Sequence, residues 1–116
     1  MANVAGVFRL VPLPGVPDEE FEEFLINDVF PSVEPVSRGL RGYSYELLKD
    51  YQGRRQDRYM WKVVLEHFGS NQMIPEFIPG MFDQVYSEAR KKVEKVGVMT
   101  SFAMFTEVSK RTGSDV

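Results

Sequence analysis

The chain has 116 residues, a net charge of −3 at pH 7 and no cysteine. With 43% hydrophobic and 27% charged residues, it has the composition of one globular domain, which excludes a disordered chain. The lack of cysteine excludes disulfides, thiolate nucleophiles and cysteine metal sites, and the acidic charge argues against nucleic acid as a partner. We therefore expect a single domain over residues 1–116 in the cytoplasm, with no membrane partner and with residues 109–116 as a flexible tail.

The first predicted element is a strand over residues 4–11. Residues alternate along it, so that Phe8 and Leu10 point to one side and Val7 and Arg9 to the other. The sequence PLPG follows, and its prolines cannot continue a ladder of hydrogen bonds. The strand should therefore end there.

A helix is predicted next, with Asp18 as its N-cap and an acidic outer face. Phe21, Leu25 and Val29 recur at helical spacing on the other face. Pro31 is expected to stop the helix. This pattern is typical of an amphipathic helix that lies against a sheet.

Two strands are predicted at Gly42 to Asp50 and Arg58 to Phe68, joined by a turn around residues 52–56. A turn at this place brings residues of like parity opposite one another. Glu46 and Lys62 should then lie nearly opposite each other, and we expect them to form a cross-strand ion pair.

The last third of the chain is predicted to hold a second helix and a fourth strand. Pro75 and Pro79 indicate a turn or a broken helix, so the main helix should run over residues 81–95, with Gly97 just past its end. Residues 98–108 then alternate as the last strand.

The order of these elements is β-α-β-β-α-β, which predicts an α+β, ferredoxin-like fold. In this fold two helices cover one face of a four-stranded antiparallel sheet. The other face of the sheet is left open.

The two faces of the predicted sheet differ in composition. One face is apolar almost throughout and should lie under the helices; it carries Tyr43, Tyr45, Leu47, Tyr59, Trp61, Val63, Leu65 and His67. The other mixes polar and charged with apolar side chains and holds Arg9, Ser44, Glu46, Lys62 and Glu66 among Val7, Val11, Leu48, Met60, Val64 and Phe68. Such a mixture suits a face covered by a second subunit, and we expect Glu46, Lys62 and Glu66 to lie in a dimer interface.

The segment VVLEHFGSNQMIPEFI, residues 63–78, resembles the region of the dimeric α/β-barrel superfamily where the third strand ends in an aromatic residue and leads to the second helix. This superfamily includes the proteins similar to antibiotic biosynthesis monooxygenases. The resemblance implies that two sheets pair face to face into a barrel. It also implies a pocket either inside that barrel or between each sheet and its helices.

Haem-degrading members of the superfamily resemble one another in an asparagine on the first strand, a tryptophan on the third and a histidine on the second helix. Trp61 matches the tryptophan, but Phe8 or Arg9 falls near the asparagine position and the second helix has no histidine. We therefore expect no haem and no other cofactor. A single histidine also cannot fill a transition-metal shell, so no metal is expected.

Two groups of residues are candidates for a site. His67 and Arg9 are the catalytic candidates, because histidine titrates near neutrality, although a structural histidine at the end of a strand is favoured. A ligand pocket is expected to be lined by Tyr43, Tyr45, Tyr59, Trp61 and Phe68, with packing in the core as the favoured alternative for the tryptophan and tyrosines.

The resulting hypothesis is a homodimeric α/β barrel that binds a small, largely apolar molecule, as a cofactor-independent enzyme similar to the monooxygenases. The alternative is a barrel without catalysis that binds a ligand or serves a regulatory or structural role. No motif in the sequence names a reaction.

Overall fold

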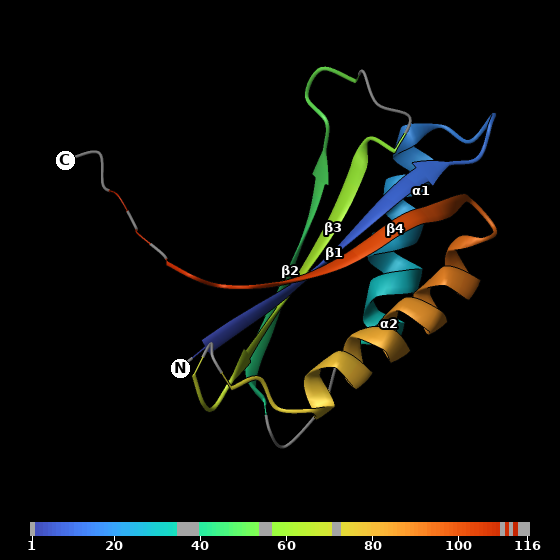
Figure 1. Ribbon diagram of the computed structural model, residues 1–116. Helices are drawn as coiled ribbons and strands as arrows, with labels where there is room; N and C mark the ends of the chain where they lie inside the picture. The colour runs from blue at the N-terminus through green and yellow to red at the C-terminus, as the bar shows by residue number, and fades with distance from the viewer. Residues whose placement is uncertain are drawn as a thin grey trace.

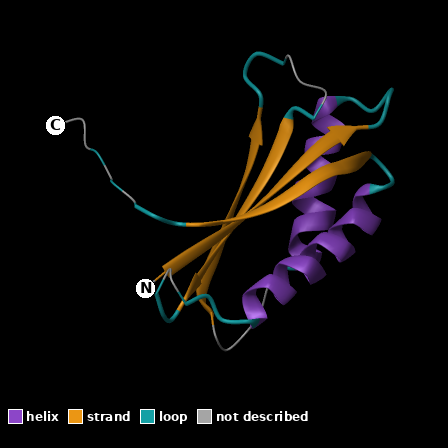
Figure 2. Ribbon diagram, viewed as in Figure 1, coloured by secondary structure: helices purple, strands orange, loops and turns teal. Residues whose placement is uncertain are grey.

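The structure is a computed structural model that describes residues 2–34, 40–53, 57–70, 73–109, 111 and 113. Its elements, in chain order, are β1 (Ala2–Pro12), α1 (Asp18–Phe24), the π-helical turn η1 (Leu25–Val29), the 3₁₀ turn η2 (Phe30–Val33), β2 (Leu40–Lys49), β3 (Tyr59–His67), α2 (Phe77–Val93) and β4 (Gly97–Thr106). The strands form one antiparallel sheet in the order β2-β3-β1-β4. Both helices lie on the same face of the sheet (Figures 1 and 2), and this arrangement confirms the predicted ferredoxin-like α+β fold. Most of the predicted tail, and most of the predicted turn around residues 52–56, lies outside the described residues.

The core lies between the helices and the sheet. On β3 every second side chain is buried, from Tyr59 to His67, as the alternation of the sequence predicts. A row of stacked rings crosses this layer, in which Trp61 has its centroid 4.5 Å from Phe30 and 4.7 Å from Phe8. Phe8 continues the row to Phe102 at 4.8 Å. Apolar contact along the whole row holds the central strands under the helices.

The first helical region runs further than the sequence predicts. Asp18 is not the N-cap: Pro17 occupies that position, and Asp18 is the first helical residue. Pro31 does not stop the helix either, because it falls in the first turn of η2, where a missing backbone N–H costs nothing. Helical structure therefore continues to Val33, beyond the predicted end.

The second helix begins earlier than predicted, at Phe77. Pro75 lies before it and Pro79 in its first turn, a position that tolerates proline for the same reason. The helix ends at Val93, so Gly97 is not the residue just past its end and is instead the first residue of β4.

Gly97 and Gly6 are places where a helix comes very close to the sheet. A Cβ atom on Gly97 would lie 2.5 Å from the ring of Phe21 and 2.5 Å from the carbonyl oxygen of Val11. A Cβ atom on Gly6 would lie 2.5 Å from the ring of Phe82. The two phenylalanines, one from each helix, therefore pack directly on the sheet backbone.

The edge strand β2 is less covered than predicted. Tyr43 and Tyr45 have the parity of the helix-facing residues, yet 37% and 39% of their surface is exposed. The first and second helices reach over β1, β3 and β4 more fully than over this edge (Figure 1). Among the described residues, no helix has the length and apolarity needed to cross a bilayer.

Candidate binding site on the open face of the sheet

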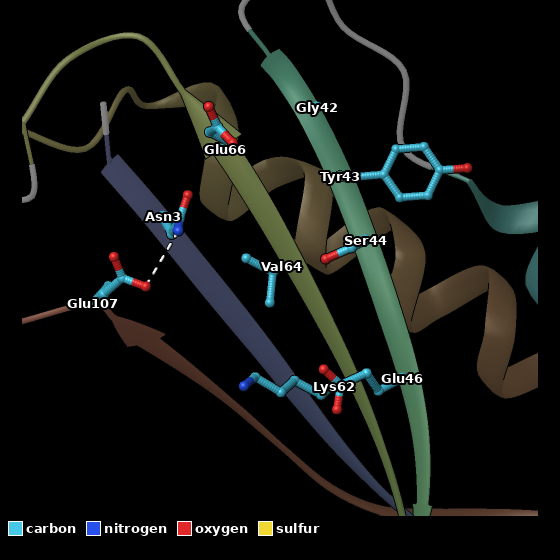
Figure 3. A pocket seen from close by; sticks show the side chains of 9 residues that line it. All are labelled: Asn3, Gly42, Tyr43, Ser44, Glu46, Lys62, Val64, Glu66 and Glu107. Atoms are coloured by element: carbon cyan, nitrogen blue, oxygen red, sulfur yellow. Dashed lines mark hydrogen bonds between the residues drawn. The ribbon is translucent and has the colours of Figure 1, made fainter. Parts of the chain in front are cut away.

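The face of the sheet turned away from the helices carries the residues predicted for a dimer interface. Strand pairing arranges them in rows across the sheet, because Glu66 pairs with Asn3, Val64 with Ala5 and Lys62 with Val7. On the other side of β3, Lys62 pairs with Glu46, which confirms the predicted register. Glu46, Lys62 and Glu66 therefore come together on one face, where Figure 3 shows them.

This part of the face is hollowed. One hollow has a volume of about 520 Å³ and is lined mainly by polar groups, which come from Asn3, Gly42, Tyr43, Ser44, Glu46, Lys62, Val64, Glu66 and Glu107. A second hollow of about 280 Å³ is more apolar and is lined by Asn3, Ala5, Val7, Lys62, Val64, Phe105, Thr106 and Glu107. The two share Asn3, Lys62, Val64 and Glu107 in their linings, so they lie side by side, and we call them together the open-face hollow.

Lys62 lies in the middle of the open-face hollow. The expected ion pair with Glu46 is not formed, although the two residues are neighbours on adjacent strands. The lysine side chain instead extends across β1, toward the apolar part of the hollow (Figure 3). Within the described part of the chain, its ammonium group has no carboxylate at ion-pair distance.

The carboxylates at the end of the hollow are held by neighbouring groups. The guanidinium of Arg41 lies 3.6 Å from a carboxylate oxygen of Glu66, and both side chains are partly exposed. The amide nitrogen of Asn3 donates a hydrogen bond of 3.2 Å to Glu107. Arg41 also lies over the ring of Phe68, which is 62% exposed.

Arg9 lies on the same face, closer to the other end of the strands. It borders a separate hollow of about 240 Å³ together with Leu48, Lys49, Asp50, Arg58 and Met60.

His67, the other catalytic candidate, lies on the opposite side of the sheet and is fully buried. Its Nδ1 atom is 3.3 Å from the carbonyl oxygen of Phe68, and no described group pairs with its Nε2 atom. His67 borders none of the hollows described here. The structure therefore does not bring His67 and Arg9 together.

The aromatic residues predicted for a pocket are only partly assembled. Tyr43, Tyr45 and Trp61 border a hollow of about 10 Å³ under the helices, which has room for about one water molecule. Tyr59 lies away from it and donates a hydrogen bond of 2.6 Å to Glu22. Phe68 lies at the surface, beyond the end of β3. These five side chains therefore do not line one common pocket.

Two tyrosine hydroxyls are held in the protonated state. Burial, with a hydrogen bond to Glu34, raises the pKa of Tyr43 to about 12. Burial, with the hydrogen bond to Glu22, also raises the pKa of Tyr59 above its ordinary value. Both groups therefore act as hydrogen-bond donors at neutral pH and not as bases.

Several residues that line the open-face hollow were not predicted as site residues from the sequence, among them Asn3, Ser44, Val64 and Glu107. Val64 and Ser44 were assigned to the correct face but not to a site. Extending the alternation of β1 back by one step would have placed Asn3 beside Glu66. Among the described residues, no three histidine, aspartate or glutamate side chains come together as metal ligands.

No family model matches the chain, and no curated protein matches it. Among solved structures, it is similar to a protein described as a provisionally assigned chlorite dismutase, with a TM-score of 0.50 and 12% sequence identity. The match covers 91% of this chain and 44% of the other, so the chain spans less than half the length of the structure it matches. At this identity the similarity shows the fold alone: four antiparallel strands with two helices in a ferredoxin-like arrangement.

Proposed function

We propose that two copies of the chain pair through the open faces of their sheets and bind a small molecule in the space between them. The observation that carries this proposal is the open-face hollow, about 520 Å³ of polar space joined to about 280 Å³ of more apolar space on a face that no helix of the described chain covers. A second sheet laid over this depression would turn it into an enclosed cavity. Enclosed cavities of some hundreds of Å³ are the usual sites for small ligands.

The side chains on this face also suit a partner subunit. Leu48 and Phe105 are exposed on it, at 44% and 55%. Val7, Met60 and Val64 lie between them and are only half-buried. Burial of these groups against a second copy removes apolar surface from water, which is the main favourable term in stable association.

The lining of the hollow indicates the chemical class of the ligand. Ala5, Val7, Val64 and Phe105 would contact an apolar body. Lys62 reaches into the same space with an ammonium group that has no partner among the described residues, so it would bind an anionic or carbonyl oxygen of the ligand. The ligand expected here is therefore largely apolar and carries one such oxygen.

The family resemblance adds the prediction of a monooxygenase-like, cofactor-independent activity, and a binding barrel without catalysis is the alternative. Both functions use the same space and the same lysine. In a reaction, Lys62 would stabilise negative charge that develops on a substrate oxygen. In a binding protein it would only hold the ligand.

Light scattering and a fluorescent probe together test the proposal. Wild-type protein should have the mass of a dimer, twice 13.3 kDa. The probe 8-anilinonaphthalene-1-sulfonate combines an apolar ring system with an anionic group, and we expect it to bind. Lys62→Met keeps an apolar stem of nearly the same length but removes the ammonium group, so it should weaken probe binding about tenfold.

Glu23→Gln, a change on the exposed side of α1, serves as the matched control and should leave probe binding unchanged. A monomeric wild-type protein would contradict the pairing of the sheets. Equal probe affinity of the wild type and Lys62→Met would contradict the assignment of the site.

A further inference from the structure

We infer that the two copies pair with their strands running in opposite directions, so that Arg9 of one copy reaches the Glu66 end of the open-face hollow of the other. This inference rests on the proposed function and names what completes its site. It means that the hollow is closed by a charged residue that its own chain does not supply.

The charges on the open face are separated along the strand direction. Glu66 lies in the row that contains the beginning of β1, where Asn3 binds Glu107. Lys62 lies in the middle row, and Arg9 lies one row further, paired with Met60. The carboxylates of Glu66 and Glu107 therefore lie at one end of the face, where Arg41 is close to Glu66. Lys62 and Arg9, which have no ion pair among the described residues, lie in its middle and toward the other end.

The guanidinium of Arg9 can still form an ion pair with a partner subunit. Within the described part of the chain, no carboxylate lies at ion-pair distance from its guanidinium. Arg9 shares its hollow with the apolar Leu48 and Met60 as well as with Lys49, Asp50 and Arg58, so a covering subunit would bury its charge in a place that is only partly polar. Burial of an unpaired charge is strongly unfavourable, so a stable interface must supply an acceptor.

Two identical sheets can meet face to face around a two-fold axis in two simple ways. If the axis runs along the strands, each row lies over the same row of the partner, and Glu66 and Glu107 of the two copies gather at one end. Like charges brought together in an interface cost free energy. If the axis runs across the strands, the end that holds Glu66 and Glu107 in each copy lies toward the part of the other copy that holds Arg9.

The second arrangement also satisfies the distances along the strands. With the axis near the row of Val7 and Lys62, Arg9 of one copy lies over Ala5 of the other. Glu66 is one row beyond Ala5, about 7 Å along the strand, which an extended arginine side chain can span. The same arrangement places Lys62 over the partner's middle row, which holds the partner's Lys62 and the partner's Glu46. Glu46 has no ion pair among the described residues of its own chain, so it can pair with Lys62 across the interface and offset the approach of the two lysines.

A mixing experiment with charge reversals tests this inference. In Arg9→Glu alone both inter-subunit contacts become repulsive, and the same holds for Glu66→Arg alone, so each variant should dimerise at least tenfold more weakly than the wild type. When the two variants pair with each other, the introduced glutamate of one meets the introduced arginine of the other. The second contact of that heterodimer joins the unchanged Arg9 of one chain to the unchanged Glu66 of the other. The two variants, co-expressed with tags of different mass, should therefore form heterodimers in clear excess over either homodimer by native mass spectrometry.

The matched control pairs Arg9→Glu with Glu23→Arg, which changes the same charges but places the second one on the helix side, where no excess of heterodimer is expected. A dimeric wild type whose two open-face variants mix statistically, or dimerise as well alone as the wild type, would overturn the inference and leave the proposed function standing. A monomeric wild type would overturn both. Co-expression covers the case in which one variant does not fold alone, because the heterodimer is then the species recovered.

Discussion

At the scale of single residues, the first turn of α1 is tied to the β2–β3 hairpin by a group of charges. The carboxylate of Asp18 lies 2.7 Å from the ammonium of Lys49 and binds the guanidinium of Arg58. One turn later, Glu22 accepts the hydrogen bond of Tyr59. The acidic face of this helix, which looks like a solvated surface in the sequence, thus has one side that makes specific contacts.

These contacts predict how stability depends on pH. The hydrogen bonds of Asp18 with Lys49 and Arg58 lower the pKa of its carboxyl below the ordinary value of 3.8. Since the folded-state pKa is lowered, the contribution of Asp18 is fully present above the unfolded value and is lost as the pH falls through the lower folded value. Asp18→Asn should therefore cost about 1 kcal/mol at neutral pH and progressively less below about pH 4.

Urea unfolding of both proteins between pH 7 and pH 2 measures this difference. Glu20→Gln, an exposed change on the same helix, should show no comparable effect over the range. A difference between wild type and Asp18→Asn that stays constant down to pH 2 would be incompatible with a lowered pKa.

At the scale of elements, the close packing of the two helices on the sheet depends on glycine. Gly97→Ala should lower the free energy of unfolding by about 1–3 kcal/mol, because the added methyl group meets a backbone oxygen that cannot turn away. Gly6→Ala should cost less, since the ring of Phe82 can shift. Gly42→Ala is the control on another strand, where nothing lies within 4 Å of the added atom. Chemical denaturation would rank the three variants by their free energy of unfolding. Equal stability of Gly97→Ala and Gly42→Ala would show that α1 does not pack directly on the backbone at Gly97.

The elements also show what could be predicted from the sequence and what could not. Alternation along the sequence predicted which side chains share a face of the sheet, because side-chain direction in a strand follows parity. It did not predict that Tyr43 and Tyr45, on the helix-facing side of the edge strand, are exposed. Helix ends were predicted less well, since Pro31 and Pro79 were treated as breakers without knowing that each would fall in a first turn. The role of Gly97 depends on a contact with Phe21, which is far away in the sequence, so no local pattern could reveal it.

The candidate site was predictable to a similar extent. The predicted pairing of β2 with β3 correctly placed Glu46 opposite Lys62. The direction of the lysine side chain, however, depends on neighbours from β1 and β4. The hollow itself is lined by residues of all four strands, which are far apart in the sequence, so no local pattern could reveal it.

At the scale of the whole molecule, the chain is a two-layer slab. Its shortest principal extent is 21 Å, which is about the thickness of one layer of helices and one sheet. A chain of this shape has its core on one side only. Pairing of two such slabs would give a four-layer particle with the hollow at its centre.

Pairing predicts that thermal stability depends on protein concentration. For a dimer that dissociates as it unfolds, the midpoint of thermal unfolding rises with concentration by mass action. Phe105→Asp should remove this dependence, because it places a charge in the apolar part of the interface while changing a side chain that is 55% exposed in the single chain. Differential scanning calorimetry over a hundredfold range of concentration measures the effect; a midpoint of the wild type that does not move with concentration would argue against the dimer.

The row of stacked rings has a practical meaning for spectroscopy. Trp61 is the only tryptophan of the chain and lies in the middle of that row, under the helices. Its emission should be blue-shifted, because the indole is surrounded by rings and shielded from solvent, and it reports the packing of the helices on the sheet. The open face lies on the other side of the β3 backbone, so the fluorescence of Trp61 should change little when a ligand or a second subunit binds there. Titrations of that face need an extrinsic dye or a tryptophan introduced there, whereas the native tryptophan gives an independent signal of whether the core has stayed intact.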